Sequence, residues 1–169
     1  MKKFSVKKLA LAGMFCALCV VGSVFSFPMF GSKCAPVQHM VNVLCAVLLG
    51  PWWGGAAAGI GSMLTDLLNG YAHYAPGTFV IKGCMAIAAA LLAKAMGNKA
   101  AGYAVSGVVA EVIMVAGYFG YAALLLGKGI GAAASIPGNL VQAAMGLVIG
   151  LVLFFLLKRS KVLDKLALQ

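Results

Sequence analysis

Apolar side chains fill long runs of this 169-residue chain, and the breaks between the runs fall mainly at glycine and proline. A run of about 20 apolar residues is long enough for a helix to cross a bilayer. Gly and Pro mark the places where such helices begin and end. The pattern predicts six helices, at approximately 7–27, 37–50, 51–70, 78–97, 100–126 and 136–157. We therefore expect an all-α fold, with residues 1–169 forming one domain of six transmembrane helices.

The composition agrees with a chain that lies in a lipid bilayer. Hydrophobic residues make up 63% of the sequence and charged residues 9%, and the mean hydropathy is +1.04. These values are typical of a multi-pass membrane protein. Since no polar segment is long enough to fold separately in water, any domain that couples energy to this bundle must come from another chain.

The positive charges predict the orientation of the bundle. Ten of the 13 lysines and arginines flank the first apolar run, a middle turn and the last run. They are Lys2, Lys3, Lys7, Lys8, Lys94, Lys99, Lys158, Arg159, Lys161 and Lys165. Positive residues of this kind remain on the cytoplasmic side, so both termini are expected there. The net charge of +10 does not indicate nucleic-acid binding, because no solvated basic face with interleaved aromatic residues exists.

With this orientation, the loops 28–36, 70–77 and 127–135 face outward, and most polar side chains of the helices fall in the outer half of the bundle. These side chains are Gln38, His39, Asn42, Asp66, Lys82, Tyr118, Asn139 and Gln142. The inner halves are nearly all apolar, with Glu111 as the exception. Polar groups at membrane depth are costly and usually mark a functional site. The pattern predicts an outward-facing polar pocket that is closed below by apolar side chains.

The segment GSKCAPVQHMVN (31–42) contributes most to this predicted pocket. Gln38, His39 and Asn42 have helical spacings that let them share one face, and Lys33 precedes them at the mouth. Hydrogen bonds between helices are the alternative for any one of the three. A set of four favours contact with a ligand, and replacing His39 or Asn42 with Ala is then expected to weaken binding about tenfold or more.

Three ionisable residues leave two interpretations open. Asp66 and Lys82 lie at matching depth on consecutive helices, so they either form an ion pair or contact the ligand. Glu111 is either a hydrogen-bond partner between helices or a ligand contact. All three are retained as candidates for the binding site.

The outer loop GYAHYAPG (70–77) carries three aromatic candidates, Tyr71, His73 and Tyr74. Aromatic rings are frequent at the membrane interface. The same rings are also suited to form a lid that stacks on a flat ligand. Both interpretations stay open from the sequence.

The motifs of catalysis and metal binding are absent. The sequence has no G-x-x-x-x-G-K-[ST], H-E-x-x-H or G-x-S-x-G motif and contains only three acidic residues. The five cysteines are an odd number, and most lie inside apolar runs, where a small buried side chain is the expected role. We expect no enzyme, no cofactor and no metal site.

The first predicted helix carries a ladder of small residues, Ala12, Gly13, Cys16 and Ala17. In lipid, small side chains let helices approach closely. On a terminal helix such a face packs either inside the bundle or against a partner subunit.

Several runs resemble one family of membrane proteins. They are GGAAAGIGSMLTDLLNGYAHYAPGTFVIKGCMAI (54–87), AEVIMVAGYFGYAALLLG (110–127) and IPGNLVQAAMGLVIG (136–150). These runs are similar to the substrate-binding S subunits of energy-coupling factor (ECF) vitamin transporters, and in particular to the riboflavin-type group. The segment GSKCAPVQHMVNVLCAVLLGPW (31–52) is similar to the S subunits assigned to hydroxyethylthiazole.

The resemblance implies a role and a set of partners. S subunits of this kind bind a vitamin near the outer face of a prokaryotic plasma membrane. They join a transmembrane coupling (T) subunit and two ATPase subunits, and they dock the coupling subunit on the small-residue face of helix 1. The interface candidates are then Ala12, Gly13, Cys16 and Ala17.

Both lines of reasoning lead to the expectation of a subunit of an ABC-type importer for a small water-soluble heteroaromatic compound. A thiamine precursor is the leading ligand, either hydroxyethylthiazole or hydroxymethylpyrimidine, with pyridoxine as the next candidate. The alternative is a self-sufficient carrier driven by protons, with Asp66 or Glu111 as the proton relay.

Overall fold

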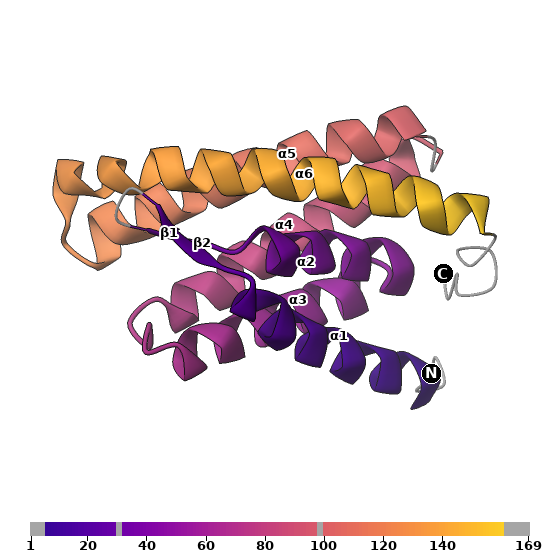
Figure 1. Cartoon of the computed structure of the whole chain (residues 1–169), viewed down its shortest axis with the longest axis horizontal. Helices are drawn as coiled ribbons and strands as arrows, with labels where there is room; N and C mark the ends of the chain where they lie inside the picture. Colours follow the sequence, from indigo (N-terminus) through magenta and orange to yellow (C-terminus); the bar gives the residue numbers. More distant parts are fainter. Residues whose placement is uncertain (1–5, 30–31, 98–99, 161–169) are drawn as a thin grey trace.

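The computed structural model describes residues 6–29, 32–97 and 100–160, and this part of the chain forms a bundle of six α-helices with one short β-hairpin (Figure 1). The helices are α1 (Val6–Val24), α2 (Pro36–Leu49), α3 (Pro51–Leu68), α4 (Ala75–Ala95), α5 (Ala100–Gly120) and α6 (Ile136–Arg159). The hairpin consists of β1 (Phe27–Met29) and β2 (Ser32–Cys34). The predicted all-α class and the predicted number of helices are confirmed.

Four helical segments in the described part are long and apolar enough to cross a membrane. They are Val6–Val24, Ala75–Ala95, Ala101–Leu125 and Gly129–Leu157. Helix α2 is a shorter apolar helix. Helix α3 has 18 residues, and its glycines and Asp66 lower its hydropathy.

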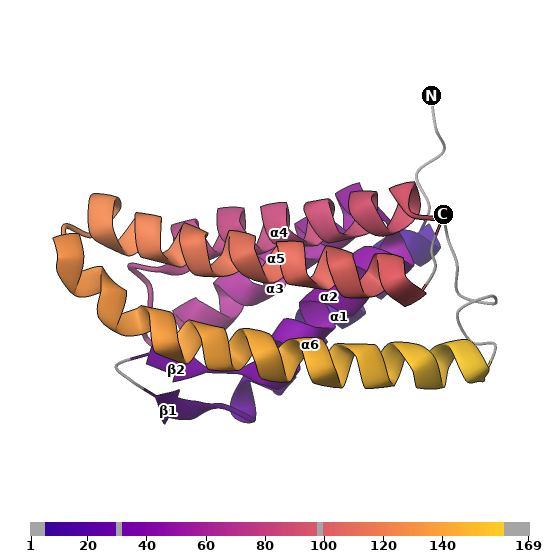
Figure 2. The same cartoon turned by 90° about the horizontal axis from the view of Figure 1, so that it is seen from above.

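The connections at one end of the bundle differ from the plain loops that the sequence predicts. Helix α1 ends at Val24, and the chain then forms an antiparallel hairpin in which Phe27 pairs with Cys34. This hairpin lies beside the first turns of α6 (Figure 2). Helix α5 continues through a π-helical turn, Tyr121–Leu125, and a 3₁₀ helix, Gly129–Ser135, leads into α6. The sequence places 121–125 in the predicted helix 100–126 and 127–135 in a loop, because helix-like periodicity does not distinguish these tighter or wider turns.

The turn between α2 and α3 is as tight as the Gly50-Pro51 pair predicts. Gly50 has φ = +80°, which is a left-handed conformation that glycine adopts without strain. Pro51 stands in the first turn of α3, where its missing N–H has no helical partner to lose. The two helices also approach closely, because a Cβ atom on Gly54 would lie 2.4 Å from Cα of Ala46.

Helix α2 occupies the centre of the bundle and contacts α1, α3, α4 and α6. One apolar cluster, which includes Phe15 and Leu49, joins α1, α2 and α3. A second, which includes Met85 and Met114, joins α4, α5 and α6. The start of α1 and the end of α6 lie at the same end of the molecule, and the hairpin and the 3₁₀ helix lie toward the other end (Figure 1).

The small residues of α1 do not form the single face that the sequence predicts. Ala12 is buried, and Cys16 packs against α3, where its thiol donates to the carbonyl oxygen of Ala57 at 3.3 Å. Gly13 and Ala17 are exposed, and the space beside Gly13 is open. Neighbouring positions point about 100° apart on a helix, so the i, i+4 pair Gly13 and Ala17 faces outward while Ala12 and Cys16 face the bundle.

Candidate functional site

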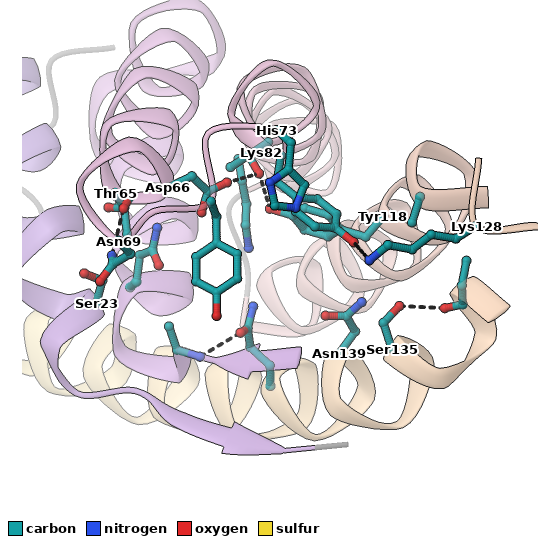
Figure 3. A pocket seen from close by; sticks show the side chains of 18 of the residues that line it. Ser23, Thr65, Asp66, Asn69, His73, Lys82, Tyr118, Lys128, Ser135 and Asn139 are labelled. Atoms are coloured by element: carbon teal, nitrogen blue, oxygen red, sulfur yellow. Dashed lines mark hydrogen bonds between the residues drawn. The ribbon is translucent and has the colours of Figure 1, made fainter. Parts of the chain in front are cut away.

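A cavity of about 280 Å³ opens among the loops and helix ends opposite the start of α1. Its walls come from the end of α1 and from α2, α3, α4, α5 and α6, together with the loops that join them (Figure 3). Nine of the predicted site residues line it, namely Gln38, Asp66, Tyr71, His73, Tyr74, Lys82, Tyr118, Asn139 and Gln142. Polar side chains from all parts of the bundle therefore meet in one place, as their matching depth predicts.

One wall is a chain of hydrogen bonds that joins three helices. The hydroxyl of Thr78 on α4 donates to Oδ2 of Asp66 on α3 at 2.5 Å. The hydroxyl of Tyr118 on α5 donates in turn to Oγ1 of Thr78 at 3.1 Å. The sequence pattern does not single out Thr78, because a threonine at a helix start is unremarkable. In the structure it orients a carboxylate at the cavity.

The floor of the cavity is formed by Lys82, whose side chain is almost fully enclosed. Its Nζ atom lies 2.9 Å from Nδ1 of His39 and 3.1 Å from Sδ of Met114, and 5.8 Å from the centre of the Tyr118 ring. Of the two alternatives open for this pair, an ion pair with Asp66 is therefore not the one that the geometry favours, because Lys82 contacts His39 and Met114 while Asp66 accepts from Thr78.

His39 and Glu111 lie behind Lys82 and do not line the cavity. Nε2 of His39 forms a buried hydrogen bond with Oε1 of Glu111. Of the two interpretations open for Glu111, contact between helices is therefore the one that the geometry favours.

Asn42 also lies outside the cavity, on the side of α2 that faces α1 and α3. Its Oδ1 atom accepts from the thiol of Cys19 at 2.9 Å, and its Nδ2 atom donates to the hydroxyl of Ser62 at 2.9 Å. The prediction that Gln38, His39 and Asn42 share one ligand-facing side of the helix is therefore wrong. Each points a different way, and only Gln38 reaches the cavity.

The wall formed by α6 is fixed to the start of α2. The backbone N–H of Ala35 donates to Oε1 of Gln142 at 2.7 Å, and the thiol of Cys34 contacts the carbonyl oxygen of Gly138 at 3.6 Å. Asn139 lies one turn earlier on α6 and also lines the cavity (Figure 3). Lys33 belongs to β2, opposite Pro28, and its side chain lies outside the described part of the structure.

Aromatic rings cover the outer side of the cavity. The rings of His73 and Tyr74 lie 4.7 Å apart between centres. Nζ of Lys128 donates to the hydroxyl of Tyr74 at 2.9 Å, and the hydroxyl of Tyr121 donates to the carbonyl oxygen of His73 at 2.9 Å. These bonds tie the α3–α4 loop to the segment between α5 and α6, directly over the cavity.

Six polar lining residues are absent from the sequence-based set: Ser23, Thr65, Asn69, Thr78, Lys128 and Ser135. Most are small hydroxyl or amide side chains in or beside apolar helices, where internal hydrogen bonds are their usual role. Lys128 has a recognisable signal, since it is a single cation in a loop predicted to face outward, away from the other lysine clusters.

The chemistry of the cavity is that of non-covalent binding. It offers amides, hydroxyls, one carboxylate and the two ammonium groups of Lys82 and Lys128 around aromatic rings, which is the usual make-up of a small-molecule site. In the described residues, no group of three or more His, Cys, Asp or Glu side chains is arranged to hold a metal ion.

Comparisons with known proteins place the chain among transport proteins. Residues 3–159 match the family described as "ECF-type riboflavin transporter, S component". A protein of Lactococcus lactis subsp. cremoris, the thiamine precursor transporter HmpT, is 30% identical over 163 residues, which cover 95% of this chain and 93% of that protein. A protein of Pyrococcus woesei, named "Uncharacterized protein in gap 3'region", is 40% identical over 118 residues, which cover 69% of this chain and 77% of that one.

Proposed function

The chain belongs to the family of ECF-type riboflavin transporter S components, and from this premise we propose that it binds a small water-soluble vitamin precursor outside the cell for import. The membership confirms the family that the runs at 54–87 and 136–150 resemble. The chain is thus a multi-pass membrane protein and a non-catalytic transport subunit that works with an ECF module. The identity of the ligand and the details of assembly form the proposal.

The observation that carries the proposal is the cavity itself. It combines Asp66 as an acceptor, Lys82 as a donor and the amides of Gln38, Asn139 and Gln142. Tyr71, His73 and Tyr74 supply rings at its outer side. A flat ring with polar substituents matches both features, because it stacks on aromatic side chains and exchanges hydrogen bonds at its edge.

The size of the cavity favours a single-ring compound. Pockets for drug-sized ligands usually measure about 300 to 1,000 Å³, and this cavity of about 280 Å³ lies just below that range. A relative that matches nearly the whole chain is named as a thiamine precursor transporter. We therefore place hydroxymethylpyrimidine and hydroxyethylthiazole first, with pyridoxine as the next candidate.

The orientation follows from the same arrangement. We place the start of α1 and the end of α6 in the cytoplasm, because the lysine-rich segments adjoin these two ends. All six helices then span the bilayer, and the cavity opens to the outside. This orientation agrees with a subunit that collects its ligand from the medium.

The proposed partners are a transmembrane coupling subunit and two ATPase subunits. Gly13 and Ala17 present an exposed small surface on α1, with the exposed side chains of Leu9 and Met14 beside it. A small-residue surface permits close approach of another helix in lipid. Ala12 and Cys16, which the sequence groups with them, support this helix from inside.

A binding titration tests the proposed function. The purified chain in detergent is titrated with hydroxymethylpyrimidine, hydroxyethylthiazole and pyridoxine by isothermal calorimetry, and its melting temperature is measured with each. One compound is expected to bind with 1:1 stoichiometry and to raise the melting temperature. If none of the three does so, the proposed ligand class is wrong.

A further inference from the structure

Three ionisable side chains form a continuous buried chain beneath the cavity. Lys82 of α4 contacts His39 of α2, and His39 contacts Glu111 of α5. Their exposed fractions are 3%, 1% and 7%. Lys82 lines the ligand cavity, and Glu111 lines a separate cavity of about 30 Å³ with apolar walls. The chain therefore connects the floor of the binding site to the apolar half of the bundle.

The contacts assign the proton positions along this chain. An ammonium group has three N–H donors and no acceptor, so Nδ1 of His39 accepts from Lys82. A neutral imidazole carries its proton on the other nitrogen, and Nε2 of His39 consequently donates to Glu111. The ring is held tightly, because a Cβ atom on Gly146 would lie 2.6 Å from Cδ2 of His39.

The charges of the chain balance without any ligand. A buried cation needs a partner, and the carboxylate of Glu111 compensates Lys82 through the neutral ring of His39. Two N–H groups of Lys82 are directed at His39 and Met114. The third N–H is available to a ligand in the cavity, since Nζ has no further hydrogen-bond partner in the described residues and its other contact is with the face of the Tyr118 ring.

From this geometry we infer that Glu111 and His39 are positioning residues that hold Lys82 as a donor at the cavity floor, and that the ligand places a neutral acceptor there, such as an unprotonated ring nitrogen. The inference rests on the proposed function and adds to it the chemistry of one ligand edge. An anionic ligand group fits less well at this position, because Glu111 already compensates the charge of Lys82. The carboxylate of Asp66 also lines the cavity, bonded to Thr78, which lies one helical turn before Lys82 on α4. An aromatic nitrogen uses the remaining N–H without adding charge.

The test compares two probes, hydroxymethylpyrimidine and an analogue in which C–H replaces each ring nitrogen. The quantity measured is the ratio of their dissociation constants for the purified full-length protein. The wild type is expected to prefer the pyrimidine by about tenfold or more, the usual effect of a hydrogen bond to a charged donor. Lys82→Met is expected to bring the ratio close to one.

Glu111→Gln separates a positioning role from a structural one. It keeps the shape of the side chain but removes the charge, and the ratio is expected to fall at least about threefold. In the Lys82→Met background, Glu111→Gln should change the ratio no further, because its effect passes through Lys82. Ser106→Ala is the matched control, since Ser106 is a buried polar residue of α5 whose hydroxyl bonds to Tyr103. It should keep the wild-type ratio.

The outcomes are distinct. If the wild type binds both probes equally, or if Glu111→Gln keeps the full preference while Lys82→Met loses it, the inference is overturned and the proposed function stands. If the wild type binds hydroxyethylthiazole or pyridoxine instead, the same ratio is measured with that compound and its analogue in which C–H replaces the ring nitrogen, and the same outcomes apply. If the wild type binds none of the three precursors, the proposed ligand class falls and the inference falls with it. Because charge loss can affect folding, each variant is compared by its melting temperature without ligand. A ratio that falls in a folded variant supports the inference.

Discussion

Asn42→Ala offers a sharp test of the geometry, because the sequence and the structure predict different results for it. From the sequence alone, Asn42 shares a ligand-facing side with His39, and its loss should weaken binding. In the structure its side chain is fully buried between α1, α2 and α3, with Cys19 and Ser62 as hydrogen-bond partners. The structure therefore predicts a loss of stability with little change in affinity.

The magnitude follows from the contacts that are removed. Hydrogen bonds between membrane helices contribute about 0.6 kcal/mol each on average, and the alanine also leaves a small void, which adds a packing loss. The free energy of unfolding should fall by about 1 to 3 kcal/mol. The dissociation constant of the bound precursor should change less than about threefold, since the cavity is not lined by Asn42.

The assay combines thermal unfolding of the detergent-solubilised variant with calorimetric titration of the ligand. His39→Ala is the comparison variant, because His39 lies only three positions before Asn42 on α2 but contacts Lys82. That variant should weaken binding about tenfold or more. Equal tenfold losses of affinity for both variants, with Asn42→Ala as stable as the wild type, would refute the assignment of their two faces.

Three further predictions follow from the same contacts. Thr78→Val removes the hydroxyl that joins Asp66 to Tyr118, so ligand affinity should fall about tenfold by calorimetry; wild-type affinity would contradict the role of this bridge. Gly146→Leu places a side chain against the His39 ring, so overpacking should clearly lower the melting temperature. The same change at Gly131, which has open space around it, should leave the melting temperature unchanged. Proteoliposomes that hold the purified chain alone should show no accumulation of radiolabelled precursor under a proton gradient; uphill accumulation without ATPase partners would instead establish a self-sufficient carrier.

The depth of polar residues along the chain could be predicted from the sequence, and it located most of the site. Apolar runs of membrane length fix which end of each helix a residue occupies, so Asp66, Tyr118 and Asn139 could be assigned to one end of the bundle. Their meeting in one cavity follows from that shared depth. The physical reason is that lipid leaves few alternatives to a helix for an apolar segment.

The direction of each side chain around its helix could not be predicted. In a membrane, an apolar face turned to lipid and an apolar face turned to a neighbouring helix have the same composition, so periodicity does not reveal the interior side. Gln38, His39 and Asn42 therefore appeared equivalent, although each meets a different neighbour in the structure. For the same reason, the sequence did not show that Ala12 and Cys16 face the bundle while Gly13 and Ala17 face outward.

Native mass spectrometry of the protein purified from cells grown in rich medium tests the central claim most directly. The account predicts an adduct of one single-ring vitamin precursor per chain in the wild type. In the Lys82→Met variant the adduct should be lost or strongly reduced. A bare chain mass for the wild type, together with no heat of binding for any of the three precursors, would contradict the claim that this cavity is their binding site.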